Sequence, residues 1–181
     1  MDNYLLMKKT EELVNFSKEL GFENTYFLGT DFSLIKNIKS KKELLKKIRE
    51  SKLKTIYFAE TEELLRFALE KTDVNMVIGA EKINPRNSVH FLRGALDQIV
   101  CKIAAEKSKT IVFSFNDILQ DSSLIDRMKL NLKLCRRYNV STIFSNFCNS
   151  KWEMRSAKDL QAFFNVLNVR KIYKVLFLIF L

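Results

Sequence analysis

The sequence predicts an α/β fold built on a parallel sheet, and three observations support this. Short apolar runs and amphipathic helical segments alternate along the 181 residues. The apolar runs do not alternate with polar residues, as half-exposed strands would, so both faces of each strand should be covered. Four glycines and one proline leave little material for linkers. We therefore expect one compact domain over residues 1–181.

Seven strands are expected, at about residues 3–7, 25–29, 53–59, 74–78, 110–115, 140–145 and 174–180. A (β/α) barrel of the TIM type has eight strands, and residues 89–92 are a weak candidate for the missing one. The alternative is an open, doubly wound sheet. The sequence has neither a glycine-rich dinucleotide-binding motif nor a P-loop that would separate the two.

Polar residues that can cap helices precede most of the amphipathic segments. Thr10, Ser40 and Thr61 each stand immediately before a segment with helical apolar spacing. Further helices are expected over residues 94–107, from Ser122 or Ser123 to residue 138, and from Ser156 onward.

The net charge of +10 is concentrated near the carboxyl end of the chain. Residues 1–126 contain 20 Lys or Arg and 19 Asp or Glu, whereas residues 127–181 contain 11 basic and two acidic residues. A merely solvated basic surface would distribute its charge more evenly along the chain. The uneven distribution favours a polyanionic partner.

Cysteine and histidine usage argues against several classes of protein. Cys101, Cys135 and Cys148 form no CxxC pair, which is typical of a reducing, intracellular setting and leads us to expect a cytoplasmic protein. His90 is the one histidine, too few for a hydrolytic site with several histidine metal ligands. We expect no membrane partner, because the apolar run at 175–181 is far shorter than the roughly 20 residues that a spanning helix needs.

The candidate site is centred on residues 140–166. An apolar run at 140–144 is typical of a buried strand. A polar loop is expected at 145–151, and an amphipathic helix is expected to begin at Ser156. In parallel α/β folds the carboxyl ends of strands hold the binding groups. The chemistry should therefore lie in the loops that follow the strands.

Residues suited to RNA occupy these predicted loops. Lys and Arg neutralise phosphates, and amide groups donate to sugar and phosphate oxygens. The candidates at strand ends are Arg86, Arg93, Asn116, Asn146, Lys151 and Arg155. A second basic set, Lys129, Lys133, Arg136 and Arg137, lies on one predicted helix. Trp152 either stacks on a base or packs in the core, and the sequence leaves both open.

Two other functions remain open on the residues alone. Asp31, Glu60, Glu81 and Asp117 could form the carboxylate site of a metal-dependent phosphoesterase. Helix capping and exposure to solvent are the simpler explanation of such residues, and we favour it on the sequence alone. Alternatively, the basic helix at residues 129–137 could bind an acidic protein partner, which would make the chain a protein-interaction module.

Three segments resemble a known family. RGALDQIVCKIAAEKSKTIVFSFNDIL (93–119), NLKLCRRYNVSTIFSN (131–146) and WEMRSAKDLQAFFNVL (152–167) are similar to the archaeal and eukaryotic ribonuclease P protein component 3 family. The shared features are a Gly-hydrophobic-Asp element, here at residues 95–97, a strand ending in Ser145, a basic Arg155, and a helix start at residues 157–160. The resemblance extends over residues 73–168.

The resemblance implies a fold and a function. It implies a TIM-barrel-like fold similar to the polymerase and histidinol phosphatase (PHP) domain, without its metal ligands and here one βα unit short. It implies a non-catalytic RNA-binding subunit of ribonuclease P, the enzyme that removes the 5′ leader of precursor tRNA. Catalysis would belong to the RNA and Mg²⁺, with no cofactor in this chain. The implied partners are ribonuclease P RNA, precursor tRNA and other protein subunits, especially a small ferredoxin-like one.

Overall fold

The computed structural model describes residues 1–83 and 96–167 of the chain. Within them the strands are β1 (Asp2–Leu5), β2 (Asn24–Phe27), β3 (Phe32–Ile35), β4 (Lys54–Phe58), β5 (Met76–Ile78), β6 (Thr110–Ser114) and β7 (Ser141–Ser145). The helices are α1 (Glu11–Glu19), α2 (Lys41–Glu50), α3 (Glu62–Lys71), α4 (Gln98–Glu106), α5 (Phe115–Gln120), α6 (Leu124–Arg137) and α7 (Ala157–Leu167). Two short 3-10 helices are η1 (Ala80–Lys82) and η2 (Lys151–Glu153).

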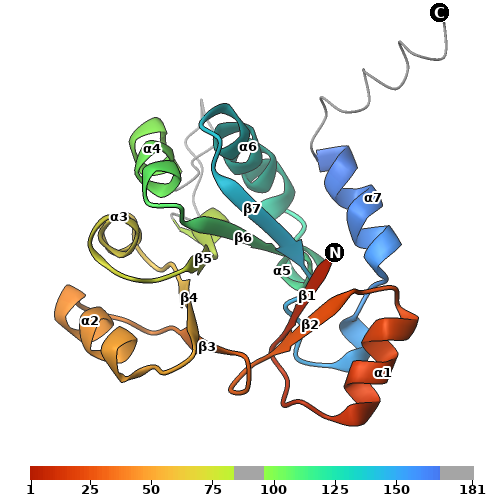
Figure 1. Ribbon diagram of the computed structural model, residues 1–181. Helices are drawn as coiled ribbons and strands as arrows, with labels where there is room; N and C mark the ends of the chain where they lie inside the picture. The colour runs from red at the N-terminus through yellow and green to blue at the C-terminus, as the bar shows by residue number, and fades with distance from the viewer. Residues whose placement is uncertain (84–95, 168–181) are drawn as a thin grey trace, which may run out of the picture.

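Every strand pair is parallel, as the continuous apolar runs predicted. Five strands form one sheet in the order β3-β4-β5-β6-β7, and β1 pairs with β2 in a second, two-stranded sheet. Neighbours in the larger sheet follow one another in the sequence. Figure 1 shows the strands at the centre of the molecule, with α1, α2, α3, α4, α6 and α7 around them.

Backbone hydrogen bonds connect the two sheets beyond their named strands. The Phe147 amide donates to the Tyr4 carbonyl at 2.9 Å, and the Leu6 amide donates to the Cys148 carbonyl at 3.0 Å. These bonds place β1 beside the segment that follows β7. On the other side, an isolated parallel bridge joins Leu28, just after β2, to Phe32 at the start of β3.

Alternate strand residues enter different apolar clusters, as the two-residue period of a strand requires. On β4, Ile56 and Phe58 join an inner cluster, whereas Tyr57 between them packs with residues of the helices. The buried members of the inner cluster come from both sheets: Tyr4, Phe32, Ile56, Met76, Ile78, Val112 and Phe147. One face of the larger sheet therefore shares a core with the smaller sheet, and the other face is covered by helices.

The predicted capping residues begin the predicted helices. The side-chain oxygens of Thr10, Ser40 and Thr61 each accept a hydrogen bond, at 3.2 Å, from the backbone amide three residues later. The helix expected from residue 94 begins at Gln98, because the Asp97 carboxylate accepts from the Val100 amide and acts as its N-cap.

One strand and one α-helix were not predicted from the sequence, and each has a local reason. β3 is only four residues long and follows a tight turn, in which the Asp31 carboxylate accepts from the Phe27 amide at 2.8 Å. α5 begins at Phe115, within the apolar run, because the Ser114 hydroxyl accepts from the Asp117 amide and caps a helix there. The strand expected at 174–180 and the candidate at 89–92 lie outside the described residues.

Candidate nucleic-acid interface

The loop after β7 is fixed to the core by Asn146. This side chain is fully buried. Its amide nitrogen donates to the Asn3 side chain at 3.1 Å and to the Arg155 carbonyl at 3.2 Å, while its oxygen accepts from the Arg155 amide at 2.9 Å. Through these hydrogen bonds Asn146, at the start of the loop, connects β1 to Arg155 at its end. A direct contact between this amide and RNA, as predicted, would require the loop to open.

Cys148 anchors the same loop in an apolar environment. It is fully buried and shares a cluster with Leu5, Phe27 and Met154. Burial raises the pKa of the Cys148 thiol to about 12, so it stays protonated at neutral pH. Cys148 therefore belongs to the core beneath the loop and cannot act there as a nucleophile.

Trp152, at the tip of the loop, is exposed to solvent. Trp152 lies in η2 and is 80% exposed, so it does not pack in the core. The Lys151 ammonium lies 5.2 Å from the centre of the indole ring. The same ammonium is 2.5 Å from the Glu12 carboxylate on α1, and this contact lowers the pKa of Glu12. The ion pair connects the tip of the loop to the first turn of α1.

Arg155 supports the loop from the other side. One of its guanidinium nitrogens donates to the carbonyl oxygens of Trp152, at 3.3 Å, and Met154, at 3.2 Å. Arg155 is nevertheless an exposed residue, and Lys151 is partly exposed. The structure thus brings together two of the predicted cations around an exposed aromatic ring.

The basic residues predicted on a helix lie on the solvent side of α6. Lys129, Lys133, Arg136 and Arg137 are all exposed. The opposite side of the helix carries buried residues, among them Met128, Leu132 and Cys135. Lys129 is 3.7 Å from Asp126, and the Arg137 guanidinium lies 5.7 Å from the centre of the Tyr138 ring. α6 therefore offers four cations on about three turns of helix.

The other predicted contacts are less accessible or are not described. Asn116 is 7% exposed, and its backbone amide donates to the Asn146 carbonyl at 3.1 Å. Arg86 and Arg93 lie outside the described residues. The sequence did not indicate a role for Glu12, because its partner Lys151 is 139 residues away.

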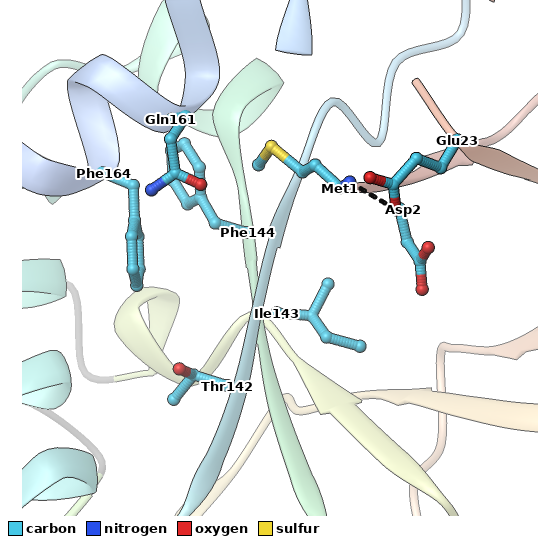
Figure 2. Close-up of a pocket in the computed structure, with 8 residues that line it drawn as sticks. All are labelled: Met1, Asp2, Glu23, Thr142, Ile143, Phe144, Gln161 and Phe164. Atoms are coloured by element: carbon cyan, nitrogen blue, oxygen red, sulfur yellow. Dashed lines mark ion pairs between the residues drawn. The ribbon is translucent and has the colours of Figure 1, made fainter. Parts of the chain in front are cut away.

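Several cavities lie elsewhere on the described part of the molecule. Figure 2 shows one of about 350 Å³, between β7, α7 and the start of the chain. The charged side chains that line it are Asp2 and Glu23, and acidic groups do not suit a phosphate. A cavity of about 250 Å³ between η1, α5 and α6 is lined by Lys82, Asp117, Gln120, Asp121, Ser123, Leu124 and Arg127.

Comparison with known proteins supports the resemblance to the ribonuclease P protein component 3 family. The chain is 27% identical over 135 residues to Ribonuclease P protein component 3 of Methanococcus maripaludis strain C5. The predicted resemblance to the ribonuclease P protein component 3 family is confirmed. The match covers 64% of this chain and spans 58% of the length of that relative. No family model matches the chain.

The fold resembles that of a chain in a solved ribonuclease P. The cryo-EM structure of archaeal ribonuclease P with mature tRNA contains a chain that superimposes with a TM-score of 0.61 and 18% identity. The match covers 96% of this chain and 84% of that chain. At this identity the likeness is one of fold.

The carboxylates considered for a phosphoesterase do not form a metal site in the described part of the chain. Glu60 accepts from the backbone amides of Asn37 and Ile38, the latter at 2.7 Å. Asp117 is 2.6 Å from Lys82. Within residues 1–83 and 96–167, no three His, Cys, Asp or Glu side chains are grouped to hold a metal ion. The similarity to a ribonuclease P protein does not favour the phosphoesterase alternative.

The described helices are also unsuited to a bilayer. None of those within residues 1–83 and 96–167 is both long enough and apolar enough to cross a membrane.

Proposed function

We propose that this chain is a non-catalytic, RNA-binding protein subunit of ribonuclease P, which assists the catalytic RNA in removing the 5′ leader of precursor tRNA. The observation that carries the proposal is the sequence similarity to a ribonuclease P protein. The similar fold of a chain in the archaeal enzyme supports it. The proposed chemistry belongs to the RNA and its Mg²⁺, and this chain supplies no cofactor.

The exposed side of α6 is the proposed site of phosphate contacts. Its four exposed cations lie on one side of a single helix, where they can neutralise neighbouring phosphates. Arg155 and Lys151 would contribute from the loop after β7. In that loop Asn146 has a positioning role, because its amide holds Arg155 in place. Asn116, Arg86 and Arg93 remain proposed RNA contacts.

We also propose that the seven described strands close into a TIM-barrel-like (β/α) barrel in one domain. Two observations support closure. Hydrogen bonds join β1 to the segment after β7, and a bridge joins the end of β2 to the start of β3. In addition, the inner cluster draws residues from both sheets, as the interior of a barrel does. An eighth βα unit is not required for these contacts.

The proposed partners are ribonuclease P RNA, precursor tRNA and other protein subunits of the enzyme, including a small ferredoxin-like subunit. The proposed location is the cytoplasm, consistent with three free, buried cysteines. The net charge of +10 would attract such polyanionic partners.

Binding of the purified chain to RNA tests the proposed function. The affinity for ribonuclease P RNA should exceed that for an unrelated structured RNA of equal length, and should fall steeply as salt rises. Equal affinity for both RNAs would contradict a specific subunit. Absence of binding to either, together with capture of an acidic protein that survives nuclease treatment, would favour the protein-interaction module instead.

A further inference from the structure

Trp152 is the most exposed large apolar side chain among the described residues, at 80%. A side chain left in water contributes almost nothing to the free energy of folding through burial. The indole ring is nevertheless held by a well-ordered framework rather than by a loose loop. This combination points to a group whose apolar surface is covered by a partner.

The backbone on both sides of Trp152 is anchored. The Ser150 hydroxyl accepts from the Trp152 amide at 3.4 Å, and the Glu153 carboxylate accepts from the Asn149 amide at 3.2 Å. Two residues after Trp152, the Met154 side chain is 5% exposed and packs in the apolar cluster beneath the loop. Little backbone freedom would be lost on binding, which favours affinity.

The charges around the ring favour stacking over simple attraction of phosphate. The Lys151 ammonium is compensated by Glu12, and the Arg155 guanidinium is held by two backbone carbonyls. Glu153, the residue after Trp152, adds a negative charge to η2. The local balance is therefore near neutral, and the indole face is the feature that distinguishes this surface.

We propose that Trp152 is a stacking platform for an unpaired RNA base. Resting on the proposed function, this assigns the loop after β7 a base-stacking contact in addition to the phosphate contacts proposed for α6, Lys151 and Arg155. Every base has a flat face that can stack on indole, so the contact needs no particular sequence. Bases inside an A-form duplex are covered by their neighbours, so the partner is a base in a loop, bulge or single-stranded end.

Intrinsic fluorescence tests the proposal directly, because the chain contains one tryptophan. The full chain is titrated with ribonuclease P RNA and, separately, with inorganic polyphosphate, which carries charge but no bases. RNA should quench the emission of Trp152, and polyphosphate should not. Fluorescence anisotropy of labelled RNA measures binding independently of the tryptophan.

Variants supply the second readout. Trp152→Ala should weaken RNA binding about 5- to 100-fold without changing the salt dependence, since it removes a stacking contact and no charge. Trp152→Phe should retain part of the affinity. Leu53→Ala, at another exposed apolar position, should bind as the parent does. Thermal unfolding of each variant verifies that it is folded.

The outcomes separate this proposal from the proposed function. If RNA binds the parent and Trp152→Ala equally tightly and leaves the emission unchanged, the stacking platform is wrong and RNA binding stands. If no RNA binds the parent, both proposals fail. If the emission responds to another protein subunit in the absence of RNA and never to RNA, the ring belongs to a protein interface and the stacking proposal is overturned.

Discussion

At the scale of single residues, burial decides what each polar side chain in the loop after β7 does. Asn146 and Asn149 are three residues apart in the same polar stretch. One is fully buried and makes three hydrogen bonds, and the other is exposed. Both are amides in a predicted loop, so sequence alone does not distinguish the buried residue from the exposed one. Only the position of β1 across the loop separates them.

Replacing Asn146 should therefore destabilise the protein. Asn146→Ala leaves the Arg155 amide and carbonyl without their partners and should lower the free energy of unfolding by about 2–3 kcal/mol. Urea denaturation measures the change. Asn149→Ala is the matched control, and its free energy of unfolding should stay within about 0.5 kcal/mol of the parent. Equal effects of the two substitutions would contradict the assigned role.

Glu81 gives the protein a predicted dependence of stability on pH. The side chain is fully buried, and burial raises its pKa from 4.5 to about 7. Below about pH 4.5 both folded and unfolded chains hold the proton. Between pH 4.5 and 7 only the folded chain retains it, so this group's contribution to stability falls as pH rises. Above about pH 7 the loss is complete.

Glu81→Gln, which resembles the neutral carboxyl group, should remove this dependence. The variant should be more stable than the parent at pH 8, by up to about 3 kcal/mol, and similar to it at pH 4. Thermal and urea unfolding across pH 4–8 measure the difference. The control is Glu106→Gln, at an exposed position of α4. A Glu81→Gln variant that is less stable than the parent at pH 8 would show that the carboxylate has a stabilising partner.

At the scale of elements, α6 combines two faces with different tasks. One side contributes to the core through Met128, Leu132 and Cys135. On the same side, the buried Arg127 donates to the carbonyl oxygens of Glu81 and Ile83, which fixes η1 against the helix. The other side presents the four exposed cations. Packing of the first face therefore holds the second in a fixed orientation.

Removal of the α6 cations should reduce the salt dependence of RNA binding. Changing Lys129, Lys133, Arg136 and Arg137 to Gln should lower the slope of log affinity against log salt by about 3, since each phosphate contact contributes about 0.7 to 0.9. Electrophoretic mobility shifts over a salt series measure the slope. A control variant with Lys42, Lys46, Arg49 and Lys52 changed to Gln removes the same charge from exposed positions on and after α2. An equal loss of slope in the control would indicate a general charge effect.

At the scale of the whole molecule, the two sheets share an interior. Tyr4 of β1 stacks on Phe147 with ring centres 5.5 Å apart, and its ring lies 5.6 Å from that of Phe32. These contacts join the start of the chain to the end of β7 and to the first strand of the larger sheet. The proposed barrel depends on them, because among the strands of residues 1–83 and 96–167 no pairing links the two sheets.

Amide hydrogen exchange can test this closure. The amides of Leu6 and Phe147, which donate across the junction between β1 and the segment after β7, should be protected to a similar degree as those of the β6–β7 pairing. Mass spectrometry or NMR follows the exchange. Exchange of both amides as fast as that of exposed loop residues would show that the sheets separate readily, and would contradict a closed barrel.

The sequence by itself determined the features that depend on neighbouring residues. Thr10, Ser40 and Thr61 cap helices through contacts within one turn, and the apolar runs formed parallel strands as expected. Tertiary structure decided the rest, because burial depends on residues far apart in the chain. The loop after β7 illustrates this: Asn146 is buried by a strand 143 residues away, whereas Trp152, six residues later, is left in solvent.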